Sequence, residues 1–384
     1  MLDFYDIERQ FTDDEKLARD TAREFVDNEV LPIINDHFRD GTFPRHLIKE
    51  MGRRGLIGGK IAGMKGELSN VGYGLIMQEL ERGDSAMRSF ASVQCGLVAN
   101  AISLFGNEEQ KQMWLPALAS GEKVGCFGLT DPRGGSDPAA MSAVAKEVPG
   151  GYELKGIKQW ITNAGFADVA VVWARLDGIV RGFVVEADTD GFDQKSVLGE
   201  KYSLRASQTG ILYLDRCIVP KENFLPGTKG MGSALKCLNK ARYGISCGVI
   251  GAAQACYEAA LKHASFRELF GKKLAAFQLT QDKFARMVAD ITSMQLMALR
   301  LGQLRDAKKA KPVQISLAKK ENVEKACNVA LTALGILGAH GIYDGYPVIR
   351  HLMNLQGAVS TYEGTPEIHK LIIGQEVTGY STFR

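Results

Sequence analysis

The chain has 384 residues, which is more than one ordinary hydrophobic core accommodates and fits two or three domains. Hydrophobic residues make up 45% and charged residues 24%, a composition that excludes a disordered or fibrous protein. The formal net charge is +3, with both signs dispersed and no basic block, so we expect no nucleic-acid partner.

Residues 1–125 are predicted to form a helical domain. Thr12 and Glu15 make a capping-box pattern ahead of apolar residues at helical spacing, namely Leu17, Ala18, Ala22, Phe25, Val26 and Val30. Pro32 ends or bends this helix. Further helices are predicted over 71–82 and 108–118.

Residues 126–230 consist of short apolar runs divided by Gly, Pro, Asp and Asn, which is typical of strands and turns. The pairs Gly150-Gly151 and Asp177-Gly178 are hairpin signals, and a last strand is expected over 210–219. The strands are not interleaved with helices, so we predict an antiparallel β-domain rather than a doubly wound sheet.

Residues 231–384 have the apolar spacing of α-helices and are predicted to be helical. Apolar residues between Phe277 and Leu301 repeat about every 3.5 residues, and Pro312 opens another helix that ends near Leu337. The predicted fold class is therefore α+β: an N-terminal helical domain, a middle antiparallel β-domain and a C-terminal four-helix bundle. No G-x-G-x-x-G or P-loop motif occurs.

The seven cysteines are odd in number and irregularly spaced, which argues against a disulfide framework and favours a reducing compartment. There is no CxxC pair, so we predict no metal site. The first residues lack a targeting pattern, and no run of about 18 apolar residues indicates a membrane helix. We expect a cytoplasmic protein that binds no membrane.

Two segments of the middle domain have polar residues suited to a ligand. Residues 126–137 form a loop of Gly, Ser and Asp that can direct backbone N–H groups at a phosphate or heterocycle, although an ordinary turn has the same composition. In residues 158–165 an aromatic ring, Trp160, stands beside Thr162 and Asn163 and can flank a flat ring system. The alternative is a buried core tryptophan.

The most informative segment is 361–369. Glu363, followed by Gly364, can act as a general base on a loop. The segment also fits a helix N-terminus with Thr365 as cap and Glu367 in the first turn. Both interpretations can hold together.

Read together, the motifs Leu-Thr-Asp-Pro at 129–132, Trp-Ile-Thr-Asn at 160–163, Arg267 with Phe270 and Gln278, and Tyr-Glu-Gly-Thr at 362–365 resemble the acyl-CoA dehydrogenase family, in order along nearly the whole chain. In these flavin enzymes the base of the last motif, here Glu363, removes the α-proton of an acyl thioester. The β-hydrogen leaves as hydride to flavin N5. The backbone N–H of the base and a flavin hydroxyl hold the enolate oxygen.

The resemblance implies FAD as the cofactor. The matching flavin contacts are Phe127, Leu129, Thr130, Gly135, Ser136, Trp160, Ile161, Thr162, Thr365 and Phe383. Arg267 and Gln278 would reach the FAD diphosphate of a neighbouring subunit, which implies a homo-oligomer, and the family resemblance makes it a homotetramer. The further implied FAD contacts are Phe270, Gly335, Gly338 and Ala339. At 335–341 the chain departs from the family's Q-x-x-G-G-x-G. On residue type alone, Arg267 is a solvated charge on a helix face.

A closer resemblance is to the glutaryl-CoA branch of the family, on segments 79–85, 201–207, 238–245 and 348–351. It implies oxidation and decarboxylation of glutaryl-CoA to crotonyl-CoA in amino-acid catabolism, with electrons passing to an electron-transfer flavoprotein. Arg88, as a buried unpaired cation, would bind the distal carboxylate together with Ser89. The other implied substrate contacts are Glu81, Ser136, Leu238, Asn239, Arg242, Tyr243, Ile245, Tyr362 and Gly364.

Three alternatives stay open at this point. The chain can be an acyl-CoA dehydrogenase for another acyl group, or a glutaryl-CoA dehydrogenase that does not decarboxylate. It can also be a helical interaction protein with a decayed flavin site, which only the changes at Gly335 and Ala339 suggest.

Overall fold

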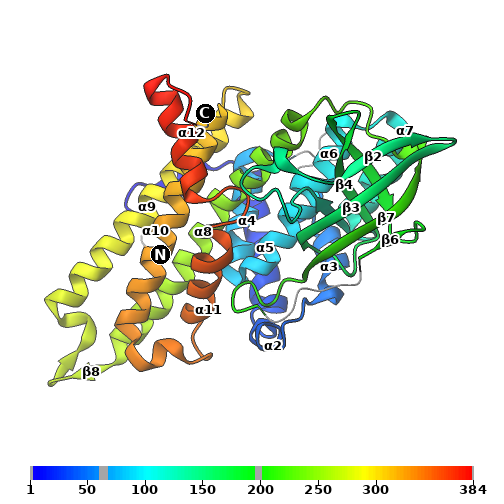
Figure 1. The fold of residues 1–384 in the computed structure, drawn as a ribbon. Helices are drawn as coiled ribbons and strands as arrows, with labels where there is room; N and C mark the ends of the chain where they lie inside the picture. Colours follow the sequence, from blue (N-terminus) through cyan, green and yellow to red (C-terminus); the bar gives the residue numbers. More distant parts are fainter. Residues whose placement is uncertain (1–2, 60–67, 195–200, 383–384) are drawn as a thin grey trace.

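The computed structural model describes residues 3–59, 68–194 and 201–382, and its N-terminal part is helical as predicted (Figure 1). The capping box is confirmed: Thr12 Oγ1 accepts from Glu15 N at 3.3 Å, and Glu15 Oε2 accepts from Thr12 N at 2.9 Å. Leu17, however, is 66% exposed, because it lies one position off the stripe that buries Ala22. The helices are α1 Asp13–Phe25, α2 Ile34–Asp40, α3 Ile48–Arg53, α4 Asn70–Gly83, α5 Ser85–Ala91, α6 Ala99–Phe105 and α7 Glu108–Ser120.

The middle part is a seven-stranded sheet in the order β1-β4-β2-β3-β7-β6, with β5 paired to β4. The predicted hairpin turns are confirmed, because β2 and β3 meet at Gly150 and β4 and β5 meet at Asp177-Gly178. The strands are β1 Gly125–Gly128, β2 Val144–Val148, β3 Gly151–Thr162, β4 Val169–Leu176, β5 Ile179–Glu186, β6 Phe192–Asp193 and β7 Thr209–Pro220.

The sheet is mixed rather than wholly antiparallel. Strand β4 pairs in parallel with both β1 and β2, while the other pairings are antiparallel. A parallel pair needs a long crossover connection. Here the β2–β3 hairpin lies between β1 and β4 in the chain and supplies that length, which strand spacing alone did not indicate.

The C-terminal part is a bundle in which α10 contacts α8, α9, α11 and α12. Helix α10 begins at Pro312, and the helix predicted to end near Leu337 does so. The elements are α8 Met231–Phe266, β8 Glu268–Leu269, β9 Lys272–Lys273, α9 Gln278–Asp306, α10 Pro312–Leu337, α11 Val348–Met353 and α12 Pro366–Thr378.

One helical stretch, Pro312–Ile342, is long and apolar enough to cross a membrane, with a mean hydropathy of 1.2 in its best window. Core helices of soluble bundles meet the same criterion, and the buried face of α10 contacts α8 and α9. The face of α10 that meets α8 and α9 accounts for part of this apolar character, since 39% of the window is buried while Leu317 and Leu331 are exposed.

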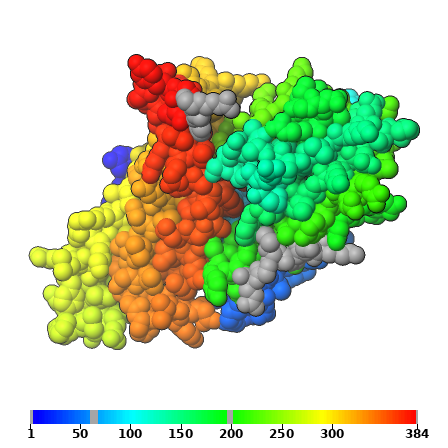
Figure 2. Space-filling view, in the orientation of Figure 1, coloured from blue at the N-terminus to red at the C-terminus, as the bar shows by residue number. Residues whose placement is uncertain are grey.

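The two helical parts adjoin each other, because α4 packs against α8 and α9, and the sheet lies to one side of both (Figure 1). Figure 2 shows the orange and red segments around α11 and α12 directly beside the green strands. Three π-helical segments interrupt the helices, at Val26–Val30, Ser92–Val98 and Asn354–Val359. Such segments often mark functional sites, and the last one leads into Glu363.

Candidate active site

Glu363 lies on a tight loop between the π-helical segment Asn354–Val359 and α12. Thr365 caps α12 by accepting from Ile368 N at 3.4 Å, and Glu367 lies in the first turn, so the helix-start interpretation is also correct. Glu363 and Gly364 adopt successive positive φ angles of 55° and 110°. This backbone turns the Glu363 side chain away from the helix axis and into the protein.

The Glu363 carboxylate is surrounded by cations. Its Oε2 atom is buried and has no hydrogen-bond partner among the described residues. Burial raises the pKa of Glu363 to about 7, against the opposing charges of Arg88, Arg242 and Lys319. A carboxylate with a pKa near neutrality and a free oxygen is suited to accept a proton from a weak carbon acid.

Arg242 on α8 fixes the backbone of the base. Its Nε donates to the Glu363 carbonyl at 2.7 Å, and its side chain is buried. The neighbouring Gly364 is required by space as well as by φ, because a Cβ there would lie 2.8 Å from His369 Nε2 and 3.3 Å from Arg242 Nη2. The predicted substrate residues Arg242 and Gly364 therefore lie at the base itself.

Arg88 on α5 reaches the same cluster from the N-terminal domain. Its guanidinium is fully buried, its Nε donates to Glu81 Oε2 at 2.7 Å, and its Nη2 donates to Glu81 Oε1 and the Tyr362 hydroxyl. Although burial opposes the charge, Glu81 and Tyr362 raise the pKa of Arg88 above its ordinary value. Arg88 is thus held charged one residue away from the base.

The expectation of an unpaired arginine is wrong, because Glu81 neutralises Arg88. An isolated buried guanidinium would lose its hydration without compensation, and the buried carboxylate of Glu81 provides that compensation. One nitrogen, Nη1, is buried and has no partner among the described residues. It can donate to a bound carboxylate. Ser89 is buried beside Arg88 on α5.

The two middle-domain motifs lie side by side at the edge of the sheet. Gln159 N donates to the Thr130 carbonyl at 3.0 Å, and the buried Lys158 Nζ donates to the Leu129 carbonyl at 2.9 Å. The loop after Thr130 is held by Asp131, whose carboxylate accepts from Arg133 N at 3.0 Å. Gly134 N also donates to the Asp131 carbonyl at 3.1 Å, so the turn interpretation is correct for residues 131–134.

Trp160 is exposed to solvent rather than buried, so the core-tryptophan alternative is wrong. It has a φ of 60° and 59% exposure at an irregularity where the β3–β7 register shifts between Lys158 and Ile161. A β-bulge of this kind re-aims a side chain out of the pleat.

This sheet edge is connected to the base loop. Thr162 pairs with Thr209 on β7, and the preceding segment 203–207 docks onto the π-helical segment before the base. Leu204 N donates to Asn354 Oδ1 at 2.7 Å, and Ala358 N donates to Ser203 Oγ at 2.9 Å. The loop of Glu363 and the strand of Trp160 are thus connected through residues 203–209, by strand pairing on one side and by two hydrogen bonds on the other.

The groups available to flank a flavin here are the exposed indole of Trp160, the loop after Thr130 and the exposed Ser136. Gly135 has open space around it. The residues that would hold the isoalloxazine end are Phe127, Leu129, Thr130, Gly135, Ser136, Trp160, Ile161, Thr162 and Thr365. Phe383 lies outside the described residues. No group of His, Cys, Asp or Glu within the described ranges could hold a metal ion.

A second set of predicted cofactor residues lies elsewhere, at the end of the bundle near β8 (Figure 1). Arg267 follows α8 directly, and the ring of His263 lies 5.1 Å from that of His340, which brings the end of α10 to the same place. This set is exposed, with Phe270 96% exposed. Within one chain it does not join the base; its members are Arg267, Phe270, Gln278, Gly335, Gly338 and Ala339.

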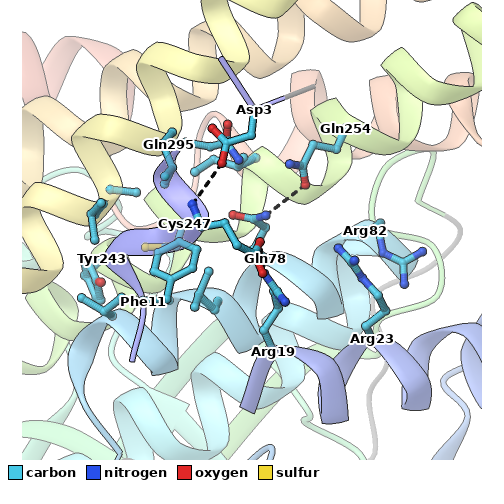
Figure 3. A pocket seen from close by; sticks show the side chains of 18 of the residues that line it. Asp3, Phe11, Arg19, Arg23, Gln78, Arg82, Tyr243, Cys247, Gln254 and Gln295 are labelled. Carbon is cyan, nitrogen blue, oxygen red and sulfur yellow. Dashed lines mark hydrogen bonds and ion pairs between the residues drawn. The ribbon is translucent and has the colours of Figure 1, made fainter. Parts of the chain in front are cut away.

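Tyr243 does not join the site around Glu363. Its hydroxyl donates to the Asn70 carbonyl at 2.9 Å, and its ring lines a cavity of about 480 Å³ between α1, α4, α8 and α9 (Figure 3). It follows Arg242 by one residue, so it points about 100° around the helix. Of the other predicted α8 residues, Ile245 is fully buried and Leu238 and Asn239 are half-buried.

Lys319 and His369 are site residues that sequence reasoning missed. Both are buried beside the base loop and line a second cavity of about 350 Å³ between α10 and α12. A signal existed for Lys319, because it falls on the apolar stripe of α10 four residues after Ile315. His369 is four residues past the Thr365 cap of α12, where nothing in the local pattern marks it.

A buried glutamate on a loop that is linked through residues 203–209 to an exposed indole, on a mixed sheet beside two helical domains, fits a flavin-dependent dehydrogenase of acyl thioesters. The chain belongs to the acyl-CoA dehydrogenase family, whose members depend on FAD: the models of its N-terminal, middle and C-terminal domains match residues 12–122, 126–217 and 228–378. The fold is the three-domain fold of that family.

Individual relatives are similar over almost the whole chain. The mitochondrial short-chain specific acyl-CoA dehydrogenase of Rattus norvegicus is 34% identical over 373 residues, which cover 93% of this chain and 88% of the relative. The solved glutaryl-CoA dehydrogenase from Mycobacterium smegmatis is 48% identical, with a TM-score of 0.96 and 98% of each chain covered. A second glutaryl-CoA dehydrogenase structure from that organism, in complex with FADH2, is 43% identical with a TM-score of 0.97, covering 100% of this chain and 99% of that one.

Proposed function

We propose that this chain oxidises glutaryl-CoA and then decarboxylates the product to crotonyl-CoA and CO2. The observation that carries the proposal is Arg88, a fully buried guanidinium in the cluster of the base with one nitrogen free to donate. A fatty acyl chain gives such a group nothing to bind, whereas a distal carboxylate does. The similarity to two solved glutaryl-CoA dehydrogenases supports the same substrate.

Glu363 performs the first proton transfer. It accepts the α-proton, and its near-neutral pKa keeps the carboxylate basic enough to do so while still partly ionised at neutral pH. Arg242 holds the Glu363 carbonyl, so the side chain keeps its direction during the transfer. FAD, when bound, supplies the oxidation by accepting the β-hydrogen as hydride.

Decarboxylation then needs a site that tolerates an extended anion. Loss of CO2 from the oxidised product leaves a dienolate, which takes up a proton to give crotonyl-CoA. The Tyr362 hydroxyl accepts a hydrogen bond from Arg88, and the guanidinium carbon of Arg88 lies 5.4 Å from the centroid of the Tyr362 ring. Tyr362 precedes the proposed base directly, so this charged pair is available for the step. Protonated Glu363 is the nearest acid that can return the proton.

The decisive experiment is anaerobic mixing of the purified holoenzyme with glutaryl-CoA, with flavin bleaching and CO2 release followed together. We expect bleaching by glutaryl-CoA to exceed that by butyryl-CoA at equal concentration, with CO2 formed in step with crotonyl-CoA. Preference for butyryl-CoA would remove the substrate assignment. Bleaching with glutaconyl-CoA as the final product would remove the decarboxylation step alone.

Variants at the ion pair test the role of Arg88. The double variant Arg88→Met/Glu81→Gln removes the pair without leaving a buried carboxylate unpaired. We expect kcat/KM for glutaryl-CoA to fall at least tenfold more than that for butyryl-CoA. Equal losses for both substrates would contradict a carboxylate-binding role.

A second candidate is a short-chain acyl-CoA dehydrogenase. It is favoured by the pairing of Arg88 with Glu81, which leaves that pair with no net charge and so able to accept an uncharged acyl chain. The relative from Rattus norvegicus is of this kind. The comparison of glutaryl-CoA with butyryl-CoA decides between the two.

The partners follow from the same proposal. We infer that an electron-transfer flavoprotein takes the electrons, that four copies assemble and that the protein works in the cytoplasm. Exposed residues of the set around Arg267 would then meet the FAD diphosphate of a neighbouring copy, since guanidinium pairs bidentately with phosphate. Replacing Arg267 by Ala should lower flavin content without affecting the environment of Glu363.

A further inference from the structure

Lys319 is a buried lysine of α10 whose two hydrogen bonds both go to the loop that carries Glu363. Its side chain is 1% exposed. Its Nζ donates to the Ser360 carbonyl at 3.0 Å and to the Gly364 carbonyl at 2.9 Å. These two carbonyls lie on either side of Glu363 in the chain, so one ammonium group closes the loop that carries the base.

The loop needs such support because its backbone is unfavourable by itself. Left-handed backbone costs a residue other than glycine about 1–2 kcal/mol, and Glu363 adopts it directly before Gly364. Arg242 holds the Glu363 carbonyl from α8, on a different element from Lys319. The carbonyls of residues 360, 363 and 364 are therefore held from two helices.

An ordinary core role does not account for Lys319. Burial lowers the pKa of Lys319 to about 7, which means that its charged form is disfavoured there, and an apolar side chain of the same length would fill the space without that penalty. The next residue, Lys320, shows the usual alternative, since it pairs with Glu321 and Glu324 near the surface.

We propose that Lys319 is a positioning residue for the catalytic base, holding residues 360–364 so that the Glu363 carboxylate faces the α-carbon of the substrate. The proposal rests on the proposed function of Glu363. Besides holding the loop, Lys319 acts electrostatically, because its positive charge favours the ionised form of Glu363.

The other groups that face Glu363 leave this effect visible. Arg88 on α5 and Arg242 on α8 stay charged throughout the accessible pH range, and burial raises the pKa of Tyr362 above its ordinary value. His369 on α12 stays neutral, since burial and the charges of Lys319 and Arg242 lower its pKa to about 3. Among these neighbours, Lys319 is thus the one whose charge a substitution changes without touching the substrate contacts.

The test compares Lys319→Met with Lys320→Met on the same helix, using holoenzyme of verified flavin content. We expect Lys319→Met to lower kcat roughly ten- to hundredfold, since a reacting group displaced by about 1 Å costs that much, with KM little changed. In the pH profile of kcat, the midpoint of the acidic limb should move up by roughly one pH unit, because the positive charge that favours ionised Glu363 is lost. Lys319→Arg, which keeps the charge and the donors, should restore the limb.

Amide hydrogen exchange gives a readout that does not depend on turnover. Peptides that span 358–366 should exchange faster in Lys319→Met than in Lys320→Met or the parent protein. If Lys319→Met lacks the parent's thermal transition, Lys319→Gln, which keeps one donor, takes its place in the same comparison. A kcat, pH limb and exchange rate equal to those of Lys320→Met would overturn the proposal. If none of the acyl-CoA substrates bleaches the flavin of the parent enzyme, the proposed function is refuted instead. The exchange result still reports on the loop in that case.

Discussion

Gly364→Ala is expected to slow the enzyme strongly without unfolding it. Gly364 has a φ of 110°, which disfavours any residue with a Cβ by about 1–2 kcal/mol or more. The new Cβ would lie 2.8 Å from His369 Nε2, a separation too short for carbon and nitrogen that are not bonded. His369 is fully buried and cannot swing into solvent, so the loop has to move.

The magnitude follows from what the loop carries. Relief of the contact moves Gly364 by several tenths of an ångström or more, and Glu363 moves with it because the two residues are adjacent. Misplacement of a reacting group by about 1 Å costs roughly a hundredfold in rate, so we expect kcat to fall roughly ten- to hundredfold. We expect the free energy of unfolding to fall by only about 1–3 kcal/mol.

The assay is stopped-flow flavin bleaching under saturating acyl-CoA, with thermal melting on the same samples. Gly374→Ala is the matched control, since it lies on α12 with open space around its Cβ and should keep both kcat and stability. Adding His369→Ala to Gly364→Ala removes the contact and should recover part of kcat. An unchanged kcat in Gly364→Ala, or an equal loss in Gly374→Ala, would refute the reasoning.

Three further predictions concern single side chains. The rate of bleaching should rise with pH with a midpoint near 7, because Glu363 must lose its proton before it can act as a base; a midpoint near the ordinary glutamate value of about 4.3 would show that burial does not control this group. Tyr243→Phe should lose about 1 kcal/mol of stability in chemical denaturation through its bond to Asn70, with kcat unchanged. If Tyr243→Phe lowers kcat while stability is unchanged, Tyr243 takes part in substrate binding and the prediction is wrong. Lys158→Met should lower the flavin retained after gel filtration, because Leu129 loses its partner. The exposed Lys155→Met on the same strand should retain it, and equal flavin content in the two variants would contradict the prediction.

The helical ends and the β-rich middle could be predicted from the sequence, because each has a local signal, whereas the assignment of Glu363 as the base stays a prediction. Capping residues, alternation of apolar residues and a motif around Glu363 are all read within a few positions of the chain. The domain boundaries at 125 and 230 stay predictions. The α-β-α order was therefore accessible without any knowledge of long-range contacts.

The parallel pairings of β4 and the partners of Arg88 could not be predicted in the same way. The parallel pairings of β4 and the contact of Arg88 with Tyr362 join residues that are far apart in the chain, whereas Glu81 lies only seven residues before Arg88, across the helix start at Asp84. Burial of a charge selects its own counter-charge, but the sequence does not show which acidic residue will be near. Glu81 was assigned to substrate, and its place as the partner of Arg88 came only from the structure.

The charges around Glu363 suggest why this site suits an anion. Arg88, Arg242 and Lys319 are buried there, and the buried carboxylates among them are Glu81 and Glu363. When Glu363 takes the α-proton, it becomes neutral, and the surplus of positive charge grows at the moment when negative charge develops on the substrate. A preorganised cation in a dry site stabilises such charge far more than water does. In the proposed function, the same surplus would favour a distal carboxylate before the reaction and a dienolate after it, so that one set of cations would serve binding, proton abstraction and loss of CO2 in turn.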